Sequence, residues 1–263
     1  MLNNVNKLQL AAFALIPALA ACGGGAGSDF ANGLPYADGT QNGGPIALEE
    51  GDRVKTQATG IRLQLVDQLV RAPISIERVD ATHLEVSFNG ETYLLEQVGS
   101  EASTVFDNAA MSIDFDTVWS YDSVSLGRMT FLGDGGISAG LVAGYLTDPS
   151  NMPSSGDILY LGTAYIDETG GMGVPSQETW DLTLVADFDE SHVSALFETP
   201  FGFVVSPQTP FDGNGFTAEL IAPGGLSGAM DGAFYTENGY VVAGNVYLTG
   251  GLTLAGVYAA TFD

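Results

Sequence analysis

The stretch that decides the fold is GAMDGAFYTENGYVVAGNVYL, residues 228 to 248. Its side chains alternate with a period of two, so that Met230 and Phe234 share one face of a strand. Asn238-Gly239 interrupts the alternation, and this dipeptide is typical of a hairpin turn because both of its residues tolerate positive φ. We therefore predict a β-hairpin that is rich in glycine and aromatic residues and has hardly any charge.

The chain closes with a second stretch of the same kind, LTLAGVYAATF at residues 252 to 262. Large Leu254 and Tyr258 share one face, and smaller Ala255 and Val257 share the other. A sheet bent into a small barrel has a tight interior in which large and small side chains alternate, and glycines mark the places where its strands coil sharply. About eight strands close such a barrel and remove its exposed edges. We predict an eight-stranded antiparallel β-barrel over residues 151–263.

The period of two also dominates the preceding half of the chain. HLEVSFNGETYLLEQV, residues 83 to 98, alternates on both sides of Asn89-Gly90 and predicts another hairpin. Residues 100 to 111 could hold one or two helical turns. The fold class is therefore all-β, with a smaller N-terminal β subdomain over residues 53–150 ahead of the barrel.

The N-terminus has the features of an export signal. An apolar stretch follows Lys7 and ends at Leu19-Ala20-Ala21-Cys22, too short for a spanning helix, which needs about 20 residues. Leu-Ala-Ala-Cys is the pattern of a bacterial lipoprotein box, so residues 1–21 are predicted to be a lipoprotein signal peptide and Cys22 to be acylated, for example with palmitate. The alternative is an ordinary secreted protein whose cleavage site happens to carry a cysteine. Cys22 is the only cysteine, which excludes an intramolecular disulfide.

Acylation would place the chain on a membrane surface. Several acyl chains on one residue hold a protein to a bilayer stably, whereas one chain does not. Gly23, rather than Asp, follows Cys22, as in lipoproteins of the outer membrane. Residues 22–52 are rich in Gly, Asn, Asp and Pro and are predicted to be a flexible tether. Whether the domain faces the periplasm or the cell exterior is left open.

The charge distribution excludes two classes of partner. The formal net charge is -25, and beyond Arg128 every formal charge is negative. Such a surface repels nucleic acid and anionic lipid headgroups. Two interpretations remain: the acidity keeps an apolar, glycine-rich protein soluble, or it attracts a cationic partner.

Several short motifs resemble a known family. They are a Met-Pro-x-x-Gly entry at Met152 to Gly156, Tyr-x-Gly-x-Ala at Tyr160 to Ala164, Gly-x-Phe-Tyr at Gly232 to Tyr235, and Gly-Val-Tyr-x-Ala from Gly256. Together they resemble the C-terminal β-barrel of transferrin-binding-protein-B-like surface lipoproteins over residues 150–263. Thr236-Glu237-Asn238 departs from that family's Gly-Pro-Asn, and Ala243-Gly244 from its usual Gly-Gly. The resemblance implies a single-lobe, lipid-anchored binding protein. Transferrin binding is not implied, because the two-lobed receptors are much longer.

One motif is typical of hydrolases. Gly136-Ile137-Ser138-Ala139-Gly140 matches the Gly-x-Ser-x-Gly nucleophile elbow, and Asp187 and His192 follow in the order of a triad. An elbow needs a helix after the serine, and the residues that follow here predict a strand. A serine hydrolase using Ser138 and His192 is therefore the weakest alternative, and we predict no catalytic residues.

Two other groups of side chains are candidates for binding. Asp187, Asp189 and Glu190 could gather a cation with His192, but they supply fewer oxygens than calcium requires, so a solvated turn is expected and no metal or cofactor is predicted. Four aromatic residues could contact a ligand or belong to the core, with at least two expected in the core: Trp119, Tyr121, Trp180 and Tyr240.

We expect an outer-membrane lipoprotein that binds a protein or a small solute, iron- or haem-related ones among them. Binding would use loops at one end of the barrel or the seam between subdomains. The alternative is a structural envelope lipoprotein without a specific ligand, which predicts no substantial pocket, whereas binding predicts a contiguous apolar patch or a cleft rimmed by polar groups. Cys22 is the only site residue predicted.

Overall fold

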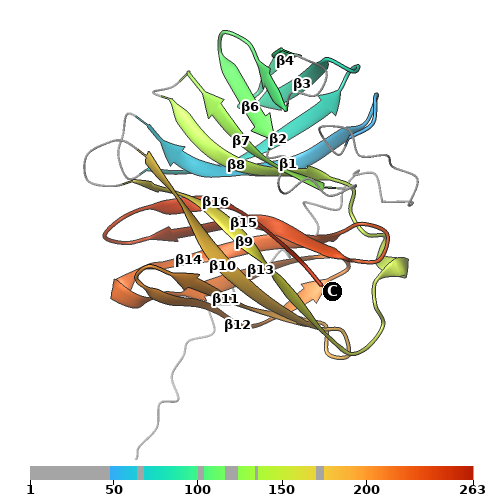
Figure 1. Ribbon diagram of the computed structural model, residues 1–263, viewed down its shortest axis with the longest axis vertical. Helices are drawn as coiled ribbons and strands as arrows, with labels where there is room; N and C mark the ends of the chain where they lie inside the picture. Colours follow the sequence, from blue (N-terminus) through green and yellow to red (C-terminus); the bar gives the residue numbers. More distant parts are fainter. Residues whose placement is uncertain are drawn as a thin grey trace, which may run out of the picture.

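The computed structural model describes residues 48–63, 68–99, 104–115, 124–133, 136–169 and 175–262. The signal peptide, Cys22 and nearly all of the tether lie outside these residues. The described chain forms two closed antiparallel barrels of eight strands each, one stacked on the other (Figure 1). The predicted all-β class is confirmed.

The first barrel contains strands β1 to β8. Their bounds are β1 Arg53–Arg62, β2 Leu69–Arg78, β3 His83–Phe88, β4 Glu91–Gln97, β5 Val105–Asp107, β6 Met111–Phe115, β7 Val124–Phe131 and β8 Ile137–Gly144. Each strand pairs with the next, and β1 closes the barrel on β8 with Thr59 opposite Gly140. The smaller N-terminal subdomain is thus itself a closed barrel. Strand β5 and the first residue of β6 lie in the described part of residues 100 to 111 and no helical turn does, so the helical alternative is wrong for this part.

The second barrel contains strands β9 to β16. Their bounds are β9 Asp157–Thr169, β10 Pro175–Asp187, β11 His192–Thr199, β12 Gly202–Asp212, β13 Gly215–Ile221, β14 Ser227–Tyr235, β15 Val241–Thr249 and β16 Leu254–Thr261. β16 pairs with β9 along its whole length and closes the sheet. The predicted C-terminal barrel and its strand number are confirmed. Two short 3-10 turns, Pro149–Asn151 and Pro223–Gly225, complete the described elements.

The segment between the barrels is held against the second one. Leu146 forms an isolated bridge with Tyr235, and the Thr147 amide donates to the Phe234 carbonyl at 2.9 Å. Asn214 adds a hydrogen bond from its Nδ2 to the Thr147 carbonyl at 2.7 Å. The connection is therefore part of the packed structure.

Both predicted hairpins are present. Asn89 and Gly90 have φ of 53° and 81°, as a two-residue Asn-Gly turn requires. The hairpin between β14 and β15 is longer than Asn238-Gly239 alone, because positive φ occurs at Thr236 and Gly239. The departure from the family pattern at Thr236 therefore lies in a turn, where a left-handed residue is needed.

The interior of the second barrel combines large aromatic side chains with glycine. Trp180, Tyr160 and Tyr258 are completely or almost completely buried in its core. A Cβ added to Gly232 would collide with the Tyr258 hydroxyl. Glycine on β14 thus makes room for a tyrosine on β16, as the alternation of large and small residues predicts.

Burial distinguishes two sides of the second barrel. Strands β9 to β13 largely alternate between buried and exposed residues, so one of their faces meets solvent. Strands β15 and β16, the C-terminal part of β14, and β8 of the first barrel are buried nearly throughout. A strand buried on both faces must be covered on its outer side. The two barrels cover each other here, along the line that we call the seam.

Candidate functional site

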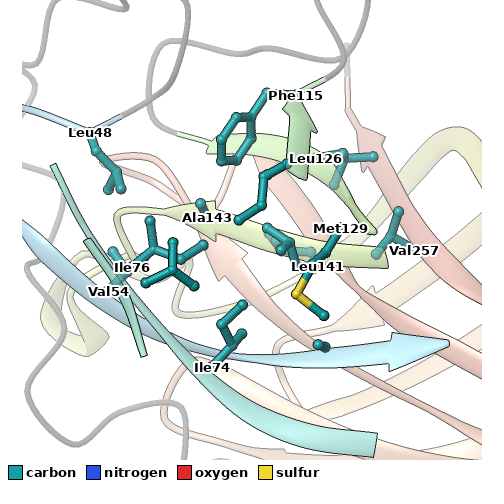
Figure 2. Close-up of a cluster of buried hydrophobic side chains, with 14 of the residues drawn as sticks. Leu48, Val54, Ile74, Ile76, Phe115, Leu126, Met129, Leu141, Ala143 and Val257 are labelled. Atoms are coloured by element: carbon teal, nitrogen blue, oxygen red, sulfur yellow. The ribbon is translucent and has the colours of Figure 1, made fainter. Parts of the chain in front are cut away.

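The seam is built on small side chains. Gly140 of β8 faces Val257 of β16 so closely that an added Cβ would lie 2.6 Å from the Val257 Cγ1. The apolar cluster of the first barrel continues across the seam, and Figure 2 shows Val257 beside its side chains. The members of this cluster from the second barrel are Ala233, Tyr235, Val241, Ala243, Val257 and Ala259. Glycine and alanine let the two sheets approach closely, so the barrels share one continuous apolar interface.

A first ion pair crosses the seam on one side. The Arg128 Nη2 of β7 lies 3.0 Å from the Asp167 Oδ1 of β9. Ser138 of β8 donates from its Oγ to the Asp167 Oδ2 at 2.7 Å and accepts from the Arg128 Nε at 3.2 Å. Asp167 is almost fully buried, so its charge is compensated by groups of the first barrel.

A second ion pair crosses the seam on the other side. The Arg71 Nη2 of β2 lies 2.7 Å from the Asp231 Oδ2 of β14, and the guanidinium also lies 4.9 Å from the ring centroid of Tyr247. The Asn245 amide donates to the Asp231 Oδ1 at 3.2 Å. Burial raises the pKa of Asp231, and the neighbouring Arg71 guanidinium opposes that shift. Asp231 is therefore a buried carboxylate that depends on a cation from the other barrel.

The two carboxylates bracket the seam. Cross-strand registers place Asp231, Asn245, Val257 and Tyr165 opposite one another on β14, β15, β16 and β9, and Asp167 follows Tyr165 two residues later. Three strand spacings of about 4.8 Å separate β14 from β9, or about 14 Å. The apolar contact of the barrels thus lies between two polar anchors.

A cleft of about 430 Å³ opens at the Arg128 side of the seam. Its walls come from β6, β7 and β8 of the first barrel and β9, β10 and β16 of the second. The lining residues are Thr104, Asp114, Phe115, Leu126, Gly127, Arg128, Gly140, Tyr165, Asp167, Gln177, Gly256 and Val257. Pockets of about 300–1,000 Å³ with a few convergent polar groups are typical of small-ligand sites.

The chemistry of the cleft is mixed. Phe115, Leu126 and Val257 line it only as core side chains that are at most 5% exposed. Asp114, which accepts from the Thr104 Oγ1 at 3.2 Å, and Asp167 supply carboxylates. Arg128 adds a half-exposed guanidinium. The cleft is therefore mainly polar and can contact a solute that carries hydrogen-bond donors.

The structure does not support the nucleophile elbow. Ser138 lies within strand β8, with no helix after it, and its hydroxyl is bonded to Asp167 and Arg128. His192 begins β11 in the second barrel, and its buried Nδ1 has no hydrogen-bond partner within the described chain. The hydrolase alternative fails because the strand continues past Ser138 and its partner is a carboxylate, not an imidazole.

The acidic stretch near His192 forms a turn. Asp187 pairs with His192 across the β10–β11 hairpin, and its Oδ1 accepts from the Glu190 amide at 3.0 Å. Asp189 accepts from the Gly156 amide at 3.1 Å. Among the described residues no three His, Cys, Asp or Glu side chains gather as a metal site. The expected solvated turn is present.

The four candidate aromatic residues have different positions. Trp180 is core, Tyr240 is exposed with its ring 5.1 Å from that of Phe262, and Trp119 and Tyr121 lie outside the described residues. No helix within the described ranges is long and apolar enough to cross a membrane.

Sequence reasoning anticipated a seam between subdomains but missed its residues. Arg71, Arg128, Asp167 and Asp231 appear in no motif. One usable indication was Asp231, the only carboxylate in the apolar run of residues 227–235. A charged residue in such a run is buried only with a partner, and the chain offers no cation after Arg128. Its partner therefore had to come from the N-terminal half if the residue was buried.

No family model and no curated protein matches this sequence. Solved structures do match it. The transferrin-binding protein B mutant Trp-176-Ala of Haemophilus parasuis has a TM-score of 0.54 at 16% identity, over 80% of this chain and 45% of that one. Isotype 1 transferrin-binding protein B from serogroup B Neisseria meningitidis has a TM-score of 0.55 at 13% identity, over 80% of this chain and 44% of that one.

These comparisons establish a shared fold. The described chain has the barrel pair of a transferrin-binding-protein-B-like structure, which confirms the resemblance found in the sequence motifs at the level of the fold. This chain spans less than half the length of those proteins.

Proposed function

We propose that this protein is a lipid-anchored binding protein of the bacterial outer membrane, and that it holds its ligand in the cleft at the seam between the two barrels. The observation that carries the proposal is the cleft itself, which brings two carboxylates and a guanidinium together in about 430 Å³ beside the apolar seam. The structural-envelope alternative predicts no substantial pocket. The proposal therefore favours a small solute, or a side-chain group of a protein ligand, as the occupant.

The rigid seam supports this role. Arg128 and Asp167 line the cleft and also join the barrels, so the cleft walls are fixed relative to each other. A preformed site binds without the cost of ordering mobile groups. The fold likeness agrees with the proposal, because the similar solved structures are of transferrin-binding protein B.

Anchoring rests on the sequence. Leu19-Ala20-Ala21-Cys22 provides the lipoprotein box, and Gly23 is compatible with outer-membrane retention. The tether over residues 22–52 would separate the barrels from the lipid surface and set their reach. Anchoring confines the binding site to the membrane and raises its local concentration there.

The ligand proposal is tested by thermal shift followed by calorimetry on the chain from residue 22 with Cys22→Ser. The compounds are iron complexes, haem and small organic cations and zwitterions. A true ligand raises the unfolding midpoint, and the double variant Asp114→Asn with Gln177→Ala removes most of the shift because both residues line the cleft.

The matched control is Asp107→Asn with Gln208→Ala, two exposed positions that are not among the cleft residues. This control should keep the full shift. A ligand whose shift survives the cleft variant binds elsewhere and contradicts the proposed site, and a panel without any binder contradicts the solute proposal.

A further inference from the structure

The outer wall of the second barrel, away from the seam, carries a continuous row of side chains across five strands. Each member lies directly opposite the next in the strand registers. The members of this outer row are Leu161 on β9, Thr183 on β10, Leu196 on β11, Val205 on β12 and Ile221 on β13. Four strand spacings of about 4.8 Å make it about 19 Å long.

Four of the five members of the outer row are apolar, and Leu161, Val205 and Ile221 are exposed, whereas Leu196 and the polar Thr183 are half-buried. Leu161 is 54% exposed and Ile221 60% exposed. Leu159 and Phe203 extend the surface beside the row at 51% and 62% exposed. Opposed side chains on neighbouring strands lie about 4.5–5.5 Å apart at Cβ, so these residues form one surface and not scattered single exposures.

The barrel does not need this apolar surface for its own core. Val204 and Leu220, the sequence neighbours of Val205 and Ile221, point inward and are buried in the core of the second barrel. The outward positions beside them could be polar at no cost to that core, as they are in ordinary half-exposed strands and as Thr183 is on β10. Contiguous exposed apolar side chains therefore indicate contact with another molecule.

Carboxylates border the row on both sides. Asp181 and Glu198 are exposed and lie opposite each other in the neighbouring cross-strand register. Glu219 is exposed two residues before Ile221 on the same face of β13. No Lys or Arg follows Arg128 in the sequence, so no cation within this barrel offsets these charges.

We propose that the outer row is a docking surface for a protein whose apolar contact patch is bordered by lysine and arginine side chains. The occupant follows from charge complementarity. A second copy of this chain would bring the same carboxylates against this wall, and anionic headgroups would be repelled in the same way. The row is a convex wall and not a cavity, which suits a protein surface better than a small solute.

This surface is separate from the cleft. No member of the outer row lines the cleft, and β9 reaches the seam only with its later residues Tyr165 and Asp167. If the cleft binds no solute, the docking proposal for the outer row is unaffected. If the outer row binds no protein, the proposal of a solute site in the cleft is unaffected.

The test uses two designed β-hairpin peptides with the same apolar face. One carries Lys and Arg beside that face, and the other carries Glu. Binding to the chain from residue 22 with Cys22→Ser, which retains both barrels, is followed by fluorescence anisotropy at low and physiological salt. The basic peptide binds and the acidic one does not, and salt weakens the binding because exposed charges are screened within about 8 Å at physiological ionic strength.

The row variant is Leu161→Thr, Val205→Thr and Ile221→Thr, in which threonine keeps a β-branched or strand-compatible residue at each position. It should weaken binding of the basic peptide at least tenfold. The matched control is Leu94→Thr with Leu132→Thr, which removes exposed leucines of the first barrel and should bind as the parent does. Asp181→Asn with Glu198→Gln should weaken the binding and reduce its salt dependence.

Four results would overturn the proposal. Equal binding of the two peptides would show that the partner's charge does not matter. Unchanged binding by a folded row variant would show that the outer row is not the binding surface. Sedimentation that shows dimers of the parent chain but not of the row variant would assign the wall to a second copy. Row-dependent capture by phosphatidylcholine vesicles would assign it to a lipid surface instead.

Discussion

Replacing Arg71 with methionine is the sharpest test of the seam. Met keeps an unbranched apolar stem beside the Tyr247 ring but removes the guanidinium 2.7 Å from Asp231. Breaking a buried pair by removing one partner costs about 3–5 kcal/mol because the other charge remains buried. The Arg71 side chain is 31% exposed, so solvent already screens part of the pair and the lower end, about 3 kcal/mol, is expected.

The cost should depend on pH. The pKa of Asp231 is raised by burial, so between the unfolded pKa of 3.8 and the higher folded value the native state binds more protons than the unfolded state. Stability therefore falls as pH rises through that window. Without Arg71 the folded pKa rises further and the window extends upward, so the deficit of Arg71→Met relative to the parent grows with pH. One proton changes the unfolding free energy by at most about 1.4 kcal/mol per pH unit, so a deficit of about 3 kcal/mol needs at least about two units to develop.

The assay is urea unfolding at pH 5, 6, 7 and 8, followed by far-UV circular dichroism. Adding Asp231→Asn to Arg71→Met should recover much of the loss at pH 8, because no charge is then left unpaired. The control Arg53→Met breaks an exposed pair with Glu77 and Glu85 and should cost no more than about 1 kcal/mol at any of these pH values. A deficit that is independent of pH, or that Asp231→Asn fails to reduce, would refute the assignment of the buried charge.

The remaining predictions concern the seam, the first barrel and the N-terminus. Gly140→Val should lower the unfolding free energy by about 1–3 kcal/mol because its side chain meets Val257, and adding Val257→Ala should restore part of the loss in the same urea titration. Ser138→Ala should lower the unfolding free energy by about 1–3 kcal/mol, because Asp167 loses the hydrogen bond from the Ser138 hydroxyl. If the parent hydrolysed a nitrophenyl ester and both Ser138→Ala and His192→Ala lost that activity, the hydrolase alternative would be supported instead. Asp80 should titrate by NMR with a pKa of about 2, because its carboxylate accepts a hydrogen bond from the Thr82 amide and a further one from the His83 side chain. The stability that this lowered pKa contributes is fully present above pH 3.8 and is lost as the pH falls toward 2. His83→Ala should raise the pKa of Asp80. Cys22→Ser should move the protein from the membrane fraction to the soluble fraction, and mass spectrometry of the parent should find an acylated N-terminal cysteine.

Local patterns predicted much of this fold because they depend on neighbouring residues. Asn89-Gly90 forms its turn because both residues can take positive φ, whatever the rest of the chain does. Leu254 and Tyr258 point into the barrel as their alternation indicated. The closure of the first barrel was less accessible, since β5 has only three residues and the short stretch around it also fitted a helical turn.

The outer contacts could not be predicted in this way. Ile221 and Val257 are both outward-facing β-branched residues in strands of one barrel, yet one is exposed and the other is covered by Gly140 of the other barrel. Alternation assigns a residue to a face but does not say what covers that face. The exposed row and the buried seam therefore differ mainly in which part of the protein packs against them. Strands β15 and β16 differ in one further way, because small residues on both of their faces allow them to be buried almost throughout.

The position of the cations gives the seam its specificity. Glycine and alanine surfaces fit one another in several registers, because small side chains interlock weakly. Arg71 and Arg128 remove that freedom, since sliding one barrel by a strand spacing of about 4.8 Å would leave Asp231 or Asp167 buried without a cation. The second barrel has no Lys or Arg of its own to take their place. From the sequence alone, the absence of basic residues after Arg128 suggested only solubility or attraction of a partner. In the structure it also means that the buried carboxylates of the second barrel can pair only with arginines of the first barrel.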